Sequence, residues 1–232
     1  GLPFSQSLSN MAALLDGERT RASFDVGDMF RVLMGPRADR LLLIFDVFLR
    51  DELLKRTIED RVFKSHADQY VANAAAATRF HTLCWQNGIH DTAEMYFISI
   101  LIGIAPLPTD VHMAMFVPIL QSQMTSKQME TWLPLATSFR ILGAYVQTEL
   151  GHGSNVRCLE TTATYDPSTQ EFDLHTPTLS ATKFWPGGLG KTATHAAVFA
   201  RLVTRGEDHG VHGFIVQLRS LSDHTPLPGV FV

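Results

Sequence analysis

The sequence predicts an α+β protein in which a helical region precedes a β region. Hydrophobic residues recur at helical spacing from about residue 11 to 135, and the segments after Phe139 carry strand signals. The chain has 232 residues, of which 45% are hydrophobic and 18% charged, so it can bury a sizeable core. We expect an α+β arrangement or two adjacent domains, with residues 1–138 helical and residues 139–232 forming the β domain.

Two segments of the first half predict helices. In residues 40–56, apolar side chains at i, i+3, i+7 and i+11 predict a buried stripe. The stripe consists of Leu42, Phe45, Leu49 and Leu53. Residues 67–85 are rich in alanine, which favours helix, and Gly88 can end that helix.

Two further helices follow. Residues 109–124 predict one that Pro118 would kink or break, because proline lacks the N–H that a helix interior uses. Thr125 can cap the next, with Gln128 placed three residues later for a capping box.

Five segments then predict strands, at residues 141–148, 160–165, 171–175, 196–204 and 213–218. Asp166-Pro167-Ser168-Thr169 supplies a turn between the second and the third.

Composition excludes several classes of function. The net charge is −4 and the basic residues are scattered, so no nucleic-acid partner is expected. The longest apolar run, residues 97–106, is about half of the ~20 residues that a membrane span needs. Cys84 and Cys158 lie far apart, which fits free thiols in a reducing compartment. The start lacks a secretory signal, and the chain begins with Gly and ends inside a strand-like segment, so we expect a piece of a longer protein.

Two glycine-rich stretches could carry chemistry, at residues 147–155 and 183–192. Glycine lets backbone approach a ligand closely, although such spacing also occurs in ordinary loops. GGLGKT is similar to a phosphate-binding loop, but Trp185 stands where that motif needs Gly, and the following residues favour a strand. No metal site is expected, because no Cys or carboxylate completes a ligand set around His209 and His212.

Read together, the two stretches and the strings between them resemble acyl-CoA oxidases. The strings TELGHG, ETTATYDP, TQEF and WPGGLGKTATHA occur in that family in this order and at this spacing. They stand at residues 148–153, 160–167, 169–172 and 185–196, followed by GFIV at 213–216 and HTPLPGV at 224–230. One departure is Phe184, where many oxidases have a first tryptophan before Pro-Gly-Gly.

The resemblance implies a fold and an activity. The fold would be an N-terminal helical domain, then an antiparallel, barrel- or sandwich-like β domain, with C-terminal helical domains missing from this chain. The activity would be FAD-dependent oxidation of fatty acyl-CoA to trans-2-enoyl-CoA, with O2 reduced to H2O2, in a peroxisomal homodimer. The catalytic glutamate would lie in the missing domains, so no catalytic residue is assigned here.

The same resemblance implies residue roles. Thr148 would hydrogen-bond the flavin, Gly187 would contact it through backbone, and Gln147 would lie beside the same pocket. Trp185 would pack near the flavin, unless it is an aromatic of the β core. Ser154 and Gly153 would lie on the acyl-CoA side.

Two alternatives stay open. An acyl-CoA dehydrogenase shares the fold but passes electrons to a carrier protein. Its loop usually has Pro and Ala where this chain has Leu150 and His152, which favours an oxidase. A chain without the C-terminal domains could also be a non-catalytic form that binds a partner.

Overall fold

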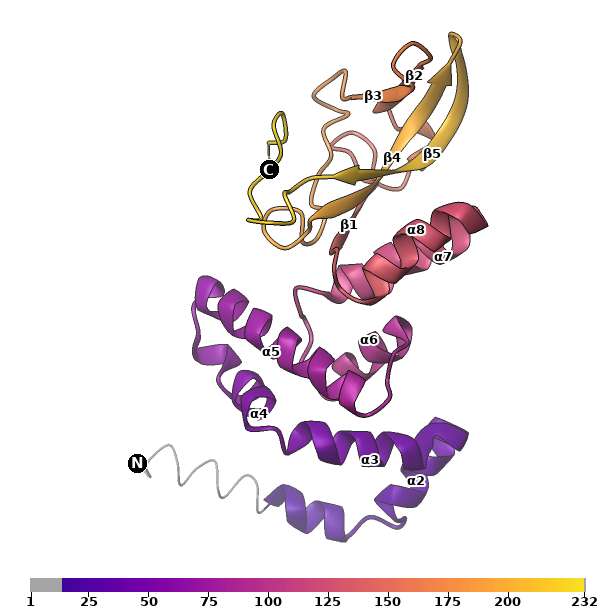
Figure 1. Ribbon diagram of the computed structural model, residues 1–232. Helices are drawn as coiled ribbons and strands as arrows, with labels where there is room; N and C mark the ends of the chain where they lie inside the picture. Colours follow the sequence, from indigo (N-terminus) through magenta and orange to yellow (C-terminus); the bar gives the residue numbers. More distant parts are fainter. Residues whose placement is uncertain (1–13, 232) are drawn as a thin grey trace. The chain divides into compact units, whose positions relative to one another are not determined.

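A computed structural model describes residues 14–231 of the chain (Figure 1). The chain divides into two compact units, with the division between Arg50 and Asp51. Helices make up the described part of the first unit, and the second contains helices followed by a sheet. The predicted α+β class is therefore confirmed, while the predicted domain boundary after residue 138 stays a prediction.

The first unit contains a helix over residues 14–20, then α2 (Val26–Met34) and α3 (Ala38–Leu49). The Asp25 carboxylate begins α2 by accepting a hydrogen bond from the Asp28 N–H at 2.9 Å.

The buried stripe predicted for residues 40–56 is wrong by one residue. The side chains of α3 that are buried are Ala38, Leu41, Ile44 and Phe48. Leu42 and Leu49 are exposed, and the helix ends at Leu49. The segment is apolar on several faces, so the same i, i+3, i+7 spacing fits two adjacent stripes and cannot choose between them.

The second unit begins with three helices, α4 (Glu52–Glu59), α5 (His66–Gln86) and α6 (Thr92–Leu101). Each starts at a side-chain cap, formed by Asp51, Ser65 and Asp91, which accepts a backbone N–H three residues later. The alanine-rich helix is confirmed as α5, and Gly88 follows it at a positive φ of 70°.

A π-helical turn (His112–Phe116) leads into α7 (Val117–Gln123), and α8 (Ser126–Thr137) follows. Pro118 lies in the first turn of α7, where a backbone N–H is not needed. The structure therefore shows a change of helical winding before the proline and no break at it. The capping box of Thr125 and Gln128 is confirmed.

The strands are β1 (Gly143–Val146), β2 (Thr162–Asp166), β3 (Glu171–His175), β4 (His195–Thr204) and β5 (Glu207–Gln217). Among the described residues they form one five-stranded sheet around β4. β5 pairs with one edge of β4, while β1 and β2 pair with successive parts of its other edge. β3 pairs with β2.

The expectation of antiparallel pairing throughout is wrong for two pairs. β1 and β2 both run parallel to β4, whereas β2–β3 and β4–β5 are antiparallel. Short turns force their flanking strands to be antiparallel, but the long connections from β1 and β2 to β4 permit parallel pairing. The alternation of apolar and polar residues shows where strands lie in the sequence, but it does not show which strands pair.

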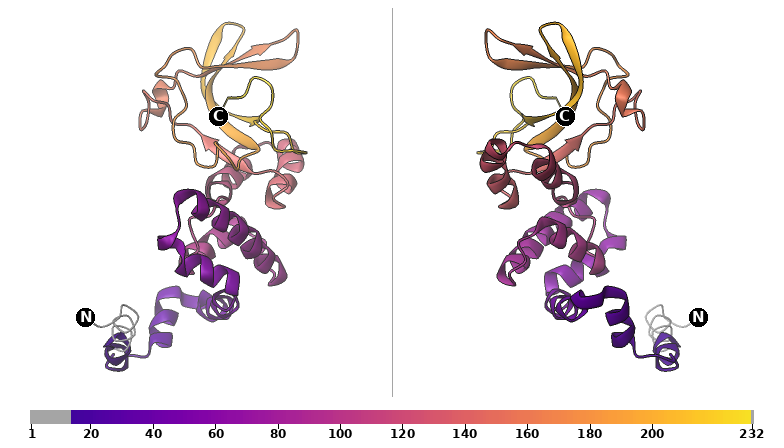
Figure 2. Two further views of the ribbon diagram at one scale, coloured as in Figure 1. Left: turned by 90° about the vertical axis from the view of Figure 1, so that its left-hand side faces the viewer. Right: turned by 90° about the vertical axis from the view of Figure 1, so that its right-hand side faces the viewer.

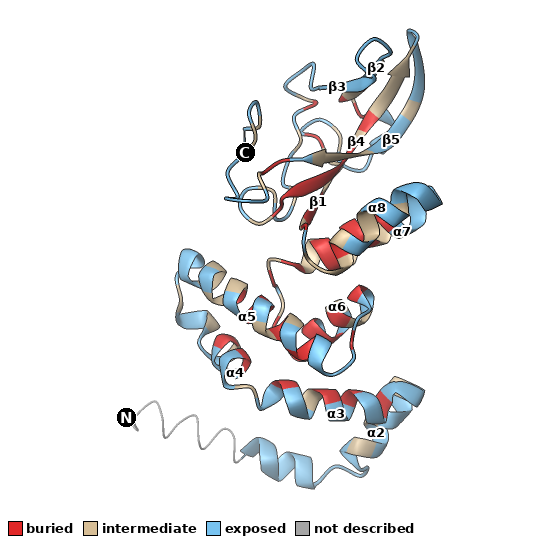
Figure 3. Ribbon diagram, viewed as in Figure 1, coloured by how far each residue is buried: buried red, intermediate tan, exposed pale blue. Residues whose placement is uncertain are grey.

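The sheet packs against the π-helical turn through a close contact between Gly143 and Phe116. A Cβ atom at Gly143 would lie 2.0 Å from the Phe116 ring, so only glycine fits there. Buried residues gather along β1 and the first half of β4, as the red segments of Figure 3 show. The side views of Figure 2 show β4 and β5 as a long curved hairpin. Packing therefore fixes β1, and with it the loop that leaves β1.

Candidate functional site

The two glycine-rich stretches lie side by side in the β region. The Phe184 N–H donates to the Thr148 carbonyl at 3.0 Å, and the Leu150 N–H donates to the Thr182 carbonyl at 2.9 Å. The Gly151 N–H continues this pairing by donating to the Ser180 carbonyl at 2.8 Å. Segments 29 to 36 positions apart in the sequence thus form one paired structure.

Thr148 and Gly187 occupy the two halves of this paired structure. Thr148 is half-buried, and its hydroxyl has no hydrogen-bond partner among residues 14–231. Gly187 is exposed, and a Cβ atom there would lie 2.7 Å from Cγ2 of Val111. Gln147, next to Thr148, accepts a hydrogen bond from the Tyr145 hydroxyl at 2.6 Å.

Trp185 is an exposed side chain, which rules out the alternative of a core aromatic. Its exposed fraction is 77%, and its backbone has a positive φ of 52°. Non-glycine residues rarely adopt this conformation, and such residues often lie at functional sites. Its ring lies 5.7 Å from the Phe184 ring, so the turn presents two aromatic side chains to solvent.

Gly153 and Ser154 lie in the exposed part of the first loop, after the paired residues. The Ser154 carbonyl accepts a hydrogen bond from the Val156 N–H at 3.0 Å. The assigned roles of these two residues near an acyl-CoA stay predictions.

A buried charged network joins the paired loops, and sequence reasoning missed it. The carboxylate of Glu149 has no exposed surface and lies 3.1 Å from Nζ of Lys183. It also accepts hydrogen bonds from the Thr161 hydroxyl at 2.6 Å and from the N–H groups of Thr161 and Glu160 at 3.0 and 2.9 Å. The sequence shows the charged residues Glu149 and Lys183 within the glycine-rich stretches. It does not show that their side chains are buried.

These donors keep Glu149 ionised. Burial by itself would raise the pKa of the carboxyl, but the hydrogen bonds from Thr161, Glu160 and Lys183 outweigh burial and lower its pKa to about 2. Burial lowers the pKa of Lys183, and the bond to Glu149 opposes that change.

His152 lies between two carboxylates. Its Nδ1 is 3.0 Å from Oε2 of Glu149, and its Nε2 is 3.5 Å from Oε1 of Glu160. Glu160 in turn accepts hydrogen bonds from the hydroxyls of Thr178 and Ser180. This arrangement supports a positional role for His152, which connects the first loop to the segment that leads to β2.

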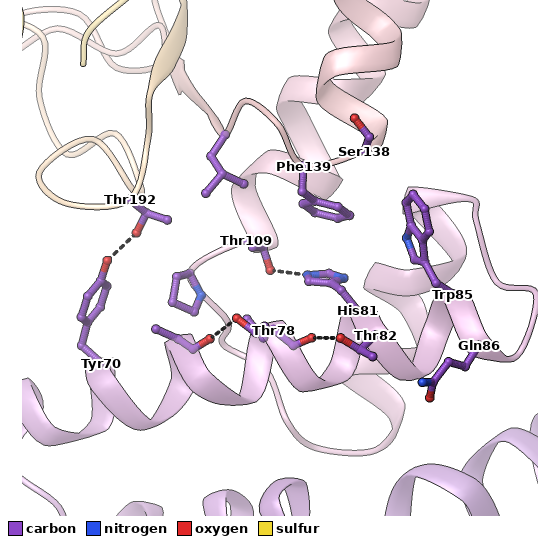
Figure 4. A pocket seen from close by; sticks show the side chains of 14 residues that line it. Tyr70, Thr78, His81, Thr82, Trp85, Gln86, Thr109, Ser138, Phe139 and Thr192 are labelled. Atoms are coloured by element: carbon purple, nitrogen blue, oxygen red, sulfur yellow. Dashed lines mark hydrogen bonds between the residues drawn. The ribbon is translucent and has the colours of Figure 1, made fainter. Parts of the chain in front are cut away.

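An apolar cavity of about 660 Å³ lies beside α5 in the second unit (Figure 4). Its lining comes from α5, the 108–109 and 138–142 segments and Thr192. Hydroxyls at its wall already have protein partners: Tyr70 bonds Thr192 at 2.7 Å, and Thr82 donates to the carbonyl of Thr78 at 2.8 Å. The cavity therefore suits an apolar occupant.

Two histidines flank Phe139, which lines the cavity: His81 is half-buried at the cavity wall, and His112 is buried behind it. The ring centroids of His81 and His112 lie 4.2 and 5.2 Å from that of Phe139. Burial lowers the pKa of both histidines to about 4, and repulsion from His112 adds to the lowering at His81. His112 also accepts the Gly143 N–H at 3.0 Å, so a neutral imidazole supports the start of β1.

A second hollow, of about 1,050 Å³, lies between α7, α8 and the sheet. None of the residues predicted to bind cofactor or substrate lines either cavity.

Residues 14–231 contain no group of three or more side chains that could hold a metal ion, and no helix long and apolar enough to cross a membrane. Within the same range Cys84 is buried and Cys158 exposed, and both are free thiols.

The helical region matches a known family. Residues 34–142 match the acyl-coenzyme A oxidase N-terminal family. The chain is 46% identical over 225 residues to peroxisomal acyl-coenzyme A oxidase 1 of Arabidopsis thaliana, a match covering 94% of this chain and 32% of that protein.

Solved structures agree with this class. The tomato acyl-CoA oxidase superposes with a TM-score of 0.84 at 45% identity, over 93% of this chain and 33% of the other. Acyl-CoA oxidase-2 of Caenorhabditis elegans, bound with FAD, ascaroside-CoA and ATP, superposes with a TM-score of 0.84 at 39% identity. This match covers 94% of this chain and 33% of the other. The chain therefore belongs to the acyl-CoA oxidase family and spans about a third of the length of these relatives. The predicted resemblance is confirmed.

Proposed function

We propose that this chain is the part of an FAD-dependent acyl-CoA oxidase that holds the flavin and receives the acyl group. The overall reaction would convert acyl-CoA and O2 to trans-2-enoyl-CoA and H2O2. The observation that carries the proposal is the pairing of Thr148 with Phe184, which brings the Trp185–Gly187 turn next to the threonine.

The residues at the paired loops fit a flavin. Within residues 14–231, neither the Thr148 hydroxyl nor the Trp185 indole N–H has a hydrogen-bond partner, so both donors are available to a ligand. The exposed backbone at Gly187 allows close approach, and the Trp185 ring offers an aromatic face. A planar ring system with polar edges matches this set of donors and surfaces.

The flavin would supply the redox chemistry, taking a hydride from the substrate and passing two electrons to O2. Thr148 would orient its polar edge, Gln147 would lie beside it, and Gly187 would hold it through backbone. Ser154 and Gly153 would contact the CoA portion of the substrate.

Glu149 is unsuited to act as the base that removes the α-proton. It is fully buried, its oxygens are occupied by hydrogen-bond donors, and its pKa is about 2. A general base works best with a pKa near the working pH. The base therefore comes from outside this buried network, in keeping with a catalytic glutamate in another part of the enzyme.

The apolar cavity beside α5 supports a fatty acyl substrate. Val111, which touches Gly187, lies two residues beyond the lining residue Thr109, and Thr192 belongs to the same turn as Gly187. An acyl chain that starts at the paired loops could therefore extend into the cavity. Peroxisomal location belongs to the same proposal and rests on the names of the relatives. A homodimer is proposed only because the family resemblance implies one.

The test uses the longest natural form of the protein that contains this chain. We expect the purified protein to carry FAD and to form enoyl-CoA and H2O2 in equal amounts from acyl-CoAs of several lengths. Enoyl-CoA formed only with an added electron carrier would indicate a dehydrogenase. Absence of peroxide and enoyl-CoA with every substrate would contradict the enzyme proposal and favour a non-catalytic binding role.

A further inference from the structure

We propose that Glu149 and Lys183 form a positioning pair that sets the spacing between Thr148 and the Trp185–Gly187 turn. Its link to flavin binding rests on the proposed function. The geometric part of the proposal stands without it.

The Glu149 carboxylate gathers three chain segments at one point. Its oxygens accept hydrogen bonds from Glu160 and Thr161, which precede β2, from His152 in the first loop, and from Lys183 in the second. A fully buried carboxylate with this many donors holds its neighbours in one arrangement, because each lost donor would leave buried charge unsatisfied.

Lys183 uses its ammonium group in the same way. Nζ lies 3.0 Å from the Gln147 carbonyl, 3.1 Å from Glu149 and 2.7 Å from the Phe199 carbonyl. An ammonium has three N–H donors, so all three are accounted for. The cation thus contacts the residues on both sides of Thr148 and fastens them to β4.

Each residue of the pair is adjacent in the chain to a residue of the candidate site, so the pair can set the position of that site. Glu149 follows Thr148, and Lys183 precedes Phe184, whose N–H donates to the Thr148 carbonyl. Moving either charged side chain would move one partner of that hydrogen bond. Trp185 and Gly187 follow within four residues of Lys183, so the second loop would shift with it.

The test measures amide hydrogen exchange in the 232-residue chain. In Lys183→Met we expect exchange at the Phe184 and Leu150 amides to accelerate about tenfold or more, because a buried carboxylate loses its cation. Amides that pair β4 with β5, such as Val198, should change less than about twofold. Asp208→Asn, which removes the Arg201 ion pair elsewhere on these strands, is the matched control and should leave Phe184 and Leu150 unchanged.

A double variant separates positioning from general stability. Glu149→Gln with Lys183→Met leaves no unpaired buried charge, so it should restore part of the protection that Lys183→Met loses. If Lys183→Met alone does not fold, the exchange measurement is made on the double variant. Equal acceleration across the whole sheet, or unchanged exchange at Phe184 and Leu150, would overturn the proposal.

Flavin titration gives the functional arm. FAD binding, followed by flavin fluorescence, should weaken about tenfold in Lys183→Met and recover partly in the double variant, while Asp208→Asn stays as wild type. Absence of FAD binding by the longest natural form, together with the expected exchange pattern, would count against the proposed function and leave the positioning pair standing. Local exchange changes with unaltered FAD affinity would overturn the link between the pair and the flavin.

Discussion

Two buried polar clusters of the second unit respond to burial in opposite ways. At the paired loops Glu149 stays ionised, with a pKa of about 2, because donors surround it. In the other cluster, His81 of α5 and His112 of the π-helical turn stay neutral, with pKa values of about 4, because burial dominates. The comparison teaches that burial alone does not decide the charge of a group; the number of donors and acceptors around it does.

Removing the charged centre should have the largest effect. Glu149→Ala leaves Lys183 buried without its partner, so we expect the free energy of unfolding to fall by about 3–5 kcal/mol. Urea denaturation at neutral pH measures this. Glu171→Ala, on the exposed strand β3, is the control and should change stability by less than about 0.5 kcal/mol. A loss below about 1 kcal/mol at Glu149 would contradict the comparison.

Acid should weaken the neutral cluster before the charged one. A histidine whose pKa is lower in the folded state favours folding above pH 6.5, and this contribution is lost as pH falls from 6.5 to about 4. Each shift corresponds to about 3 kcal/mol. The contribution of Glu149 is lost only below pH 4.5, as the pH approaches 2.

The variant His81→Phe keeps a ring against Phe139 and removes one titration. Urea midpoints from pH 7 to 4 should therefore fall less steeply than in the wild type. His209→Gln, which replaces an exposed histidine of β5, is the control. An unchanged slope in His81→Phe would mean that this histidine does not titrate as described.

Filling the cavity tests its apolar character. Ala74→Phe places a ring at the cavity wall, whereas Ala75→Phe places the same ring on the exposed neighbour in α5. Each methylene that is kept out of an apolar site should weaken binding about fourfold. We expect dodecanoyl-CoA to bind Ala74→Phe at least tenfold more weakly by calorimetry, with butanoyl-CoA unaffected. Equal effects of both variants would show that the chain does not enter this cavity.

The smallest effect is expected at Thr148. Thr148→Val keeps the shape and removes one hydroxyl, so FAD should bind about tenfold more weakly or be reduced more slowly in the longest natural form. Stability should stay within about 0.5 kcal/mol, because that hydroxyl bonds nothing in the described chain. Unaltered flavin affinity and unaltered reduction would contradict the assigned role.

Local signals in the sequence predicted much of the fold. β3 was predicted with its observed bounds, and the capping box at Thr125 was read from two residues. The parallel pairing of β1 and β2 with β4 was missed, because partners depend on contacts between distant segments. At the site, the motifs predicted Thr148 and Gly187, whereas Glu149 and Lys183 became visible only once their burial was known.

β3 lies at the end of the sheet and, among residues 14–231, pairs only with β2. A free strand edge is a place where a second chain can add on and start aggregation. Here the edge is short, and it carries the charges of Glu171 and Asp173 on alternate residues. Two copies that met through their β3 edges would bring like charges together. This end of the sheet therefore discourages self-association.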